Sequence, residues 1–159
     1  MPESNLQRLI KLAEQSFAVH DDPSQINVDE AVLRRLKEIH PNTVSELIEG
    51  DGPVAWVLLI PTTLELMNLF IGGLITEKEL FEKTPLHTSY EAIYLCSALV
   101  LEEFRNKGIA SGLSLKAIEN IRKNHPVKAL FVWPFSNEGL LTSQRVSRFS
   151  GIPLYEKEV

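Results

Sequence analysis

The chain has 159 residues, of which 44% are hydrophobic and 23% charged, as is typical of one globular domain with a sizeable core. Its formal net charge of −5 argues against a broad nucleic-acid or anionic-membrane surface, so we expect neither partner and place any anion site locally. The single cysteine, Cys96, excludes an internal disulfide framework and favours a reducing cytoplasm. We expect no signal peptide and no membrane span, because the N-terminus is charged and apolar runs are short.

The first half of the chain is predicted to be largely helical. Ser4 and Gln7 have the spacing of a capping box, in which two side chains satisfy amides at the start of a helix. Thr43 and Glu46 have the same spacing. A loop is expected over 20–24, where Asp, Pro and Ser gather. Apolar residues at helical spacing complete the prediction of helices over about 4–17, 29–39 and 43–48.

Two apolar runs predict the central strands of a sheet. Residues 54–60 are continuously apolar and lie between two prolines, which is typical of a strand covered on both faces. Residues 90–101 are rich in aromatic and branched side chains and carry one charge, Glu91, so they predict a long buried strand. Capping-box spacings between these runs predict helices over 62–71 and 76–84.

Strands and helices alternate through the rest of the chain. The expected order is a helix over 108–124, a strand over 127–133, a helix over 137–150 and a last strand over 152–157. Together with the two strands before them, these elements predict an α/β fold in which helices cover a mixed sheet.

The turn between strand 90–101 and helix 108–124 has the residues of an anion site. The first amides of a helix lack intrahelical acceptors and lie at the positive end of the helix dipole. Gly108 removes a Cβ where a phosphate would come close to the backbone, and Arg105 and Lys107 add positive charge. The alternative is an ordinary strand-to-helix turn with a glycine for close packing.

The spacing Arg105-x-x-Gly108-x-Ala110 on a strand–turn–helix resembles the acetyl-CoA signature of the GNAT superfamily of N-acetyltransferases. The resemblance implies a GNAT-like acyl-CoA N-acyltransferase fold with acetyl-CoA as cosubstrate and no metal. In the family, amides of this turn hold the pyrophosphate, and main-chain groups of the preceding strand pair with the pantetheine. The cofactor-binding residues implied here are Ala98, Leu99, Val100, Arg105, Asn106, Lys107, Gly108, Ile109, Ala110, Ser111 and Asn137.

The end of the chain resembles the family as well. There, a helix that begins near an Asn ends in a Gly–aromatic pair before another strand, and Asn137 and the Gly151-Ile152 pair take those places here. The family's fourth and fifth strands splay apart and admit the pantetheine. Pro134 cannot donate to a sheet ladder, so it would help to keep strand 127–133 from pairing with strand 90–101 at that point. The alternative for Pro134 is a plain strand terminator.

The resemblance covers residues 90–159 well and residues 1–89 poorly. We therefore divide one domain, residues 1–159, into a divergent helical N-terminal part (1–50), a helical insertion between strands (62–86) and an acetyl-CoA-binding half (90–159). The family usually begins with a strand and joins its third and fourth strands by a tight hairpin. The insertion is expected to cover the substrate side, with extra packing of the sheet as the alternative.

The catalytic residues are the weakest part of the match. Many family members protonate the leaving thiolate from a Tyr placed four residues before the Gly of the Gly–aromatic pair, and Ser147 stands at that position here. Glu91 and Tyr94 are the catalytic candidates on the long strand, Glu91 as a general base and Tyr94 as a replacement acid, with Tyr155 of the last strand as the other possible acid. The alternatives are a strand-end charge facing solvent for Glu91 and a packed aromatic for Tyr94.

These patterns lead to two hypotheses for the function. The first is a cytoplasmic acetyl-CoA-dependent N-acetyltransferase whose acceptor is a primary amine on a small molecule or peptide. The second is a non-catalytic GNAT-like module that binds CoA or a protein partner, which the serine at position 147 favours. A plain α/β interaction domain without a CoA site is a third, weaker reading. A homodimer through the last strand is possible in each case, because strand edges invite pairing.

Overall fold

The computed structural model describes residues 3–19 and 30–158, including the side chains of 3–15 and 30–158. The loop predicted over 20–24 and the predicted helix start at residue 29 lie outside the described residues. The helices are α1 (Asn5–Val19), α2 (Glu30–Ile39), α3 (Leu64–Ile71), α4 (Glu77–Lys83), α5 (Ile109–Arg122) and α6 (Asn137–Ser150), with a 3-10 turn, η1 (Glu102–Phe104). The strands are β1 (Val44–Glu49), β2 (Gly52–Thr62), β3 (Ala92–Val100), β4 (Ala129–Val132) and β5 (Leu154–Glu156).

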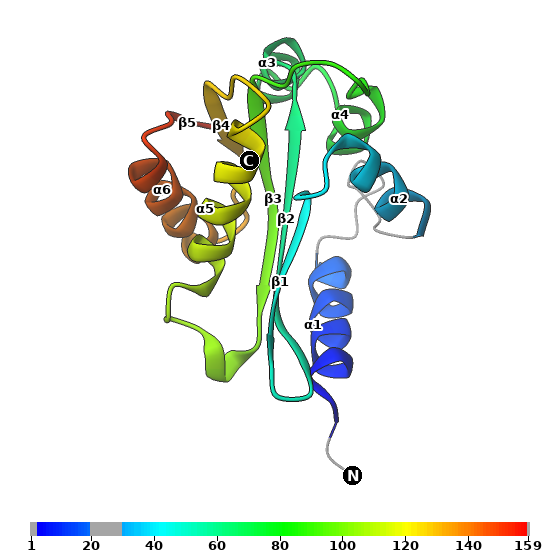
Figure 1. The fold of residues 1–159 in the computed structure, drawn as a ribbon, viewed down its shortest axis with the longest axis vertical. Coiled ribbons are helices and arrows are strands. Elements are labelled where there is room, and N and C mark those ends of the chain that lie inside the picture. Colours follow the sequence, from blue (N-terminus) through cyan, green and yellow to red (C-terminus); the bar gives the residue numbers. More distant parts are fainter. Residues whose placement is uncertain (1–2, 20–29, 159) are drawn as a thin grey trace.

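The strands form one mixed sheet in the order β1-β2-β3-β4-β5. β1, β2 and β3 run antiparallel, whereas β4 is parallel to β3 and β5 is parallel to β4. In Figure 1, α5 and α6 lie on one side of the sheet, α1 and α2 on the other, and α3 and α4 at one end. The predicted α/β class with a mixed sheet is confirmed. Among the described residues, no helix combines the length and apolarity that crossing a lipid bilayer requires.

The predicted helix over 43–48 is wrong, because this segment is the edge strand β1. It forms a hairpin with β2 through the pair Gly50-Asp51, and Gly50 has a positive φ of 66°. Thr43 does not cap a helix here, since its hydroxyl donates backward to the carbonyls of the α2 end. Glu46 lies opposite Trp56 and accepts a hydrogen bond from its indole at 3.1 Å. Pairing with β2 therefore overrides the local capping pattern.

Other capping patterns hold. The Ser4–Gln7 box is present, with both reciprocal hydrogen bonds, at the start of α1. The corresponding box at Thr76 and Glu79 begins α4. The predicted box at Thr62 and Glu65 is wrong by one residue, because Thr62 ends β2 and Thr63 caps α3. The two helices predicted within 62–86 are thus confirmed, and they pack over one end of the sheet.

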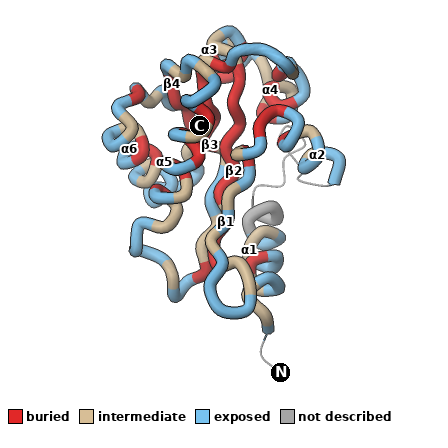
Figure 2. The backbone as a smooth tube through the Cα atoms, in the orientation of Figure 1, coloured by how far each residue is buried: buried red, intermediate tan, exposed pale blue. Residues whose placement is uncertain are grey.

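The apolar side chains of β2 contribute to two hydrophobic layers, one on each face of the sheet. Leu58 and Ile60 pack with residues of α2, α3 and α4 on one face. Val57 and Leu59 pack with residues of α5 and α6 on the other. The prediction of a strand covered on both faces is confirmed, and Figure 2 shows buried residues concentrated on the central strands. Burial of this apolar surface is the main driving force for the fold.

The third strand carries one residue more than its neighbour requires. Leu58 pairs with Ser97, whereas the next residue, Leu59, pairs with Leu95, so Cys96 is the extra residue of a β-bulge. A bulge bends its strand and increases the local twist. The pairing of β3 with β4 covers only three residue pairs and ends at Tyr94 opposite Phe131. β3 thus leaves β4 just before the bulge and continues alone on that side.

Phe70 on α3 is fully buried and joins the aromatic rings of Tyr94, Phe131 and Trp133 at centroid distances of 5.1, 5.9 and 6.0 Å. We expect Phe70→Ala to lower the free energy of unfolding by about 3–5 kcal/mol, because it opens a cavity between sheet and insertion. Phe149→Ala is the matched control, since Phe149 is 68% exposed and its truncation should cost less than about 0.5 kcal/mol. Urea unfolding of both variants measures the difference. Equal losses would contradict this view of the core.

Candidate functional site

A cleft of about 610 Å³ opens where β3 and β4 separate. One wall is the part of β3 after Tyr94, and another is the segment that joins β4 to α6. The first turn of α5 forms its outer end. Glu77 and Cys96, which belong to the α3–α4 side of the sheet, also line it, so the cleft extends past the bulge toward that side.

The start of α5 offers main-chain donors at the outer end of the cleft. Its N-cap is Gly108, which has a φ of 75° and no side chain to bond the first amides. By contrast, the N-caps of α3, α4 and α6 each accept an amide hydrogen bond through a side-chain oxygen. Ile109, Ala110 and Ser111 line the cleft. Their amides and the positive end of the helix dipole suit a phosphate group.

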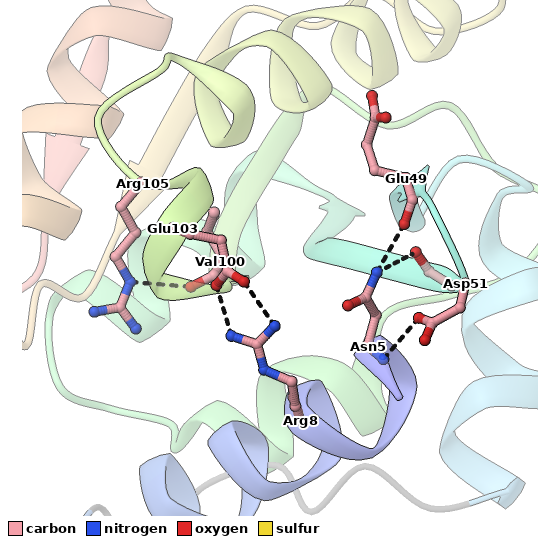
Figure 3. Close-up of polar contacts among 8 residues, drawn as sticks. Asn5, Arg8, Glu49, Asp51, Val100, Glu103 and Arg105 are labelled. Atoms are coloured by element: carbon pink, nitrogen blue, oxygen red, sulfur yellow. Dashed lines mark hydrogen bonds and ion pairs between the residues drawn. The ribbon is translucent and has the colours of Figure 1, made fainter. Parts of the chain in front are cut away.

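The charged side chains around this turn have different partners. Glu103 accepts two hydrogen bonds from Arg8 of α1, at 2.6 and 2.7 Å, which lower its pKa to about 2. Its negative charge is thereby compensated by Arg8 on the α1 side, as Figure 3 shows. Arg105 lines the cleft, and its Nε donates to the Val100 carbonyl at 3.0 Å. The Lys107 ammonium lies 5.4 Å from the Phe104 ring centre, and Lys107 is not among the cleft-lining residues.

The predicted pantetheine strand has an open edge toward the cleft. Residues 97–100 pair with β2 along one edge, and no strand of the described chain pairs with the other. Ala98, Leu99 and Val100 all line the cleft. The Val100 carbonyl already accepts from Arg105. Main-chain groups of an unpaired edge can bind an extended ligand as a neighbouring strand would.

The two predicted catalytic residues do not line the cleft. Glu91 precedes β3 at the far end of the strand, and its carboxylate lies 3.1 Å from the Lys128 ammonium. Tyr94 is 1% exposed and points into the α3–α4 layer, where its hydroxyl donates to Glu77 at 2.5 Å. Tyr94 thus lies behind the cleft rather than in it.

Of the two predicted cofactor-binding asparagines, one lines the cleft and one does not. Asn137 is the exposed first residue of α6 and does not line the cleft, whereas the preceding Ser136 lines it and caps the helix. Asn106, which has a left-handed φ of 62°, lines it as predicted. The Ser147 hydroxyl donates to the Ile152 carbonyl at 2.6 Å. Ser147 therefore secures the end of α6, where the family has its Tyr.

Glu77 is a candidate site residue that sequence reasoning missed. It is the first residue of α4, is 7% exposed and lines the cleft. In the sequence it looks like an acidic residue that favours the first turn of a capped helix. Its spacing to Leu80 and Phe81 is i+3 and i+4, which are the buried positions of α4. That pattern was available in the sequence, whereas the packing of α4 over β3 was not.

The polar groups beside Glu77 keep their protons. Burial raises the pKa of the Tyr94 phenol well above 10, and the neighbouring Cys96 and Glu77 raise it further. Burial, followed by the Glu77 carboxylate, raises the pKa of the Cys96 thiol well above 9. The Trp133 indole N–H, also at the cleft, is buried without an acceptor in the described part of the chain. A ligand oxygen could satisfy it.

We expect the alkylation rate of Cys96 by iodoacetamide to keep rising beyond pH 9, because only the thiolate reacts and its raised pKa delays ionisation. In urea, where the chain is unfolded, the alkylation rate of the same thiol should level off at a pH just above the ordinary pKa of a cysteine. Mass spectrometry over a pH series follows both reactions. Restricted access of the reagent to Cys96 lowers the rate at every pH, whereas a raised pKa changes the pH at which the rate levels off. A native profile that levels off together with the unfolded one would contradict the raised pKa.

Comparisons with known proteins give one structural match. No family model and no curated protein matches the chain. Among solved structures, the chain is similar to a tetramutant of the BH1408 protein from Bacillus halodurans, with a TM-score of 0.43 and 15% sequence identity over 92% of this chain and 83% of that one. At this TM-score a common fold is not established, so the function has to follow from the geometry of the site.

Proposed function

We propose that the protein is an acetyl-CoA-dependent N-acetyltransferase with a GNAT-like fold, which transfers an acetyl group to a primary amine on a small molecule or peptide. The observation that carries the proposal is one continuous cleft whose lining changes twice from its outer to its inner end. It has an uncapped helix N-terminus, an unpaired strand edge and a buried carboxylate.

The dimensions and polarity of the cleft fit the parts of acetyl-CoA. The amides of Ile109 to Ser111 and the Arg105 side chain would hold the pyrophosphate. From Leu95 to Val100 the strand spans roughly 17 Å at about 3.3 Å per residue, enough to pair with an extended chain that contains amide groups. The thioester would then lie near the bulge, where main-chain amides of β3 can polarise its carbonyl.

A second function is supported by a specific contact. Ser147 is engaged in closing α6 and cannot supply the acid of the family's usual Tyr. A module that binds CoA without turning it over is therefore the competing proposal. Release of free thiol from acetyl-CoA in the presence of an amine distinguishes the two. A binding module would be stabilised by CoA but would release no thiol.

We expect millimolar acetyl-CoA to raise the thermal unfolding midpoint, and ATP to raise it much less. A ligand at a hundredfold excess over its Kd adds about 2.7 kcal/mol to the free energy of unfolding, which is roughly 5–10 °C for a domain of this size. Differential scanning fluorimetry measures the shift. Equal effects of both ligands would indicate a general anion effect and contradict an acetyl-CoA site.

Gly108→Ala should weaken acetyl-CoA binding at least ~10-fold, because a Cβ would occupy the space that a phosphate needs beside the backbone. The change also strains a residue whose φ is 75°, so a loss of stability alone proves nothing. Gly151→Ala is the matched control, since Gly151 caps the far end of α6 with the same φ and has open space around it. Calorimetric titration should find near-normal affinity in the control. Equal losses of affinity in both variants would rule out the turn as the binding site.

A further inference from the structure

The indole N–H of Trp133 is a buried donor in the wall of the cleft. It has no acceptor in the described part of the chain, although the residue lines the cleft. Buried donors in native proteins are almost always paired, either with protein groups or with a molecule bound there. The chain's other tryptophan, Trp56, has a partner of its own, because its indole donates to Glu46 at 3.1 Å. The unpaired N–H of Trp133 therefore indicates an acceptor that a bound molecule supplies.

The orientation of this indole is fixed by its neighbours. The Phe135 and Phe70 rings lie 4.6 and 6.0 Å from the Trp133 ring, and the Lys157 ammonium lies 5.5 Å from its centre. Lys157 is in turn held beside β4, because its amide donates to the Val132 carbonyl at 2.9 Å. A donor on a ring that is packed in this way loses little conformational entropy when it binds a ligand atom.

The sheet places Trp133 across the gap from the β-bulge. The last residue pair between β3 and β4 is Tyr94 opposite Phe131. Cys96 and Trp133 each follow two residues later, and both pack against the α3–α4 layer, so they lie on the same face of the sheet. Both also line the cleft. A thioester beside the bulge would therefore have main-chain amides of β3 on one side and the indole on the other.

We propose that the Trp133 indole donates a hydrogen bond to the carbonyl oxygen of the thioester, so that the cleft binds acetyl-CoA more tightly than CoA. This inference rests on the proposed binding of acetyl-CoA and names the residue that recognises its acyl group. The product CoA has no oxygen at this point, so the contact favours binding of the substrate over retention of the product. During transfer the same oxygen gains negative charge, which a fixed donor stabilises.

The two tryptophans of the chain allow a direct test. Each gives an indole signal in a proton–nitrogen correlation spectrum, and the signal that remains in Trp56→Phe belongs to Trp133. Acetyl-CoA should move this proton signal downfield, because a new hydrogen bond deshields the proton. S-ethyl-CoA, in which a methylene group replaces the carbonyl, should not. The Trp56 signal should stay in place with either ligand, since Trp56 does not line the cleft.

Binding affinities give a second readout. Trp133→Phe keeps an aromatic ring in place and removes the donor, so it should weaken acetyl-CoA binding about 3- to 10-fold, the effect of one hydrogen bond. S-ethyl-CoA should bind the variant and the wild type equally well. Trp56→Phe is the matched control, because it removes an indole that donates to Glu46 outside the cleft. Calorimetric titration should find both affinities unchanged in this control.

The outcomes separate this inference from the proposed function. Stabilisation of the wild type by acetyl-CoA without movement of the Trp133 signal, or equal movement with S-ethyl-CoA, would overturn the contact with the carbonyl oxygen. So would an equal loss of affinity for both ligands in Trp133→Phe, because Trp133 would then act through its shape alone. The wild-type spectrum decides the matter even if Trp133→Phe folds poorly. Absence of stabilisation of the wild type by acetyl-CoA would instead remove the proposed function itself.

Discussion

The separation of β3 from β4 is the constraint on which the rest of the site depends. Two parallel strands normally continue their ladder as long as both remain extended, and here the ladder stops after three pairs. Two local features act together at this point. The extra residue Cys96 bends β3, and Pro134 follows the end of β4 and cannot donate to a ladder. The open edge of β3 and the cleft beside it follow from this separation.

The charges of the site are placed so that they do not oppose one another. A phosphate at the proposed site beside α5 would need a positive field, which the nearby acidic residues Glu102 and Glu103 would weaken. The bidentate contact with Arg8 holds Glu103 on the α1 side, where its charge is compensated. The buried carboxylate Glu77 lies beyond the bulge, on the α3–α4 side of the sheet. The uncapped N-terminus of α5 and the buried Glu77 side chain thus lie at opposite ends of one cleft.

Much of this arrangement can be predicted from the sequence, because the elements concerned have strong local patterns. The apolar run of β2, the capping boxes of α1 and α4 and the glycine turn before α5 each fix their own backbone. β1 could not be predicted, since its Thr43–Glu46 spacing matches a helix cap and only pairing with β2 decides otherwise. Glu77 was missed for a related reason, because its partner Tyr94 is 17 residues away and the contact exists only in the packed structure.

Hydrogen bonds fix both ends of α4, the seven-residue helix that carries the buried Glu77. The Thr76–Glu79 box satisfies the amides at the start of α4. At the other end, Arg35 of α2 donates to the Thr84 carbonyl at 2.6 Å. The Thr84 hydroxyl shares a buried hydrogen bond of 2.8 Å with Thr62 of β2. These contacts tie the insertion to both the sheet and α2. Residues of α2 and β2, which come before the insertion in the chain, therefore help to hold Glu77 at its place beside the cleft.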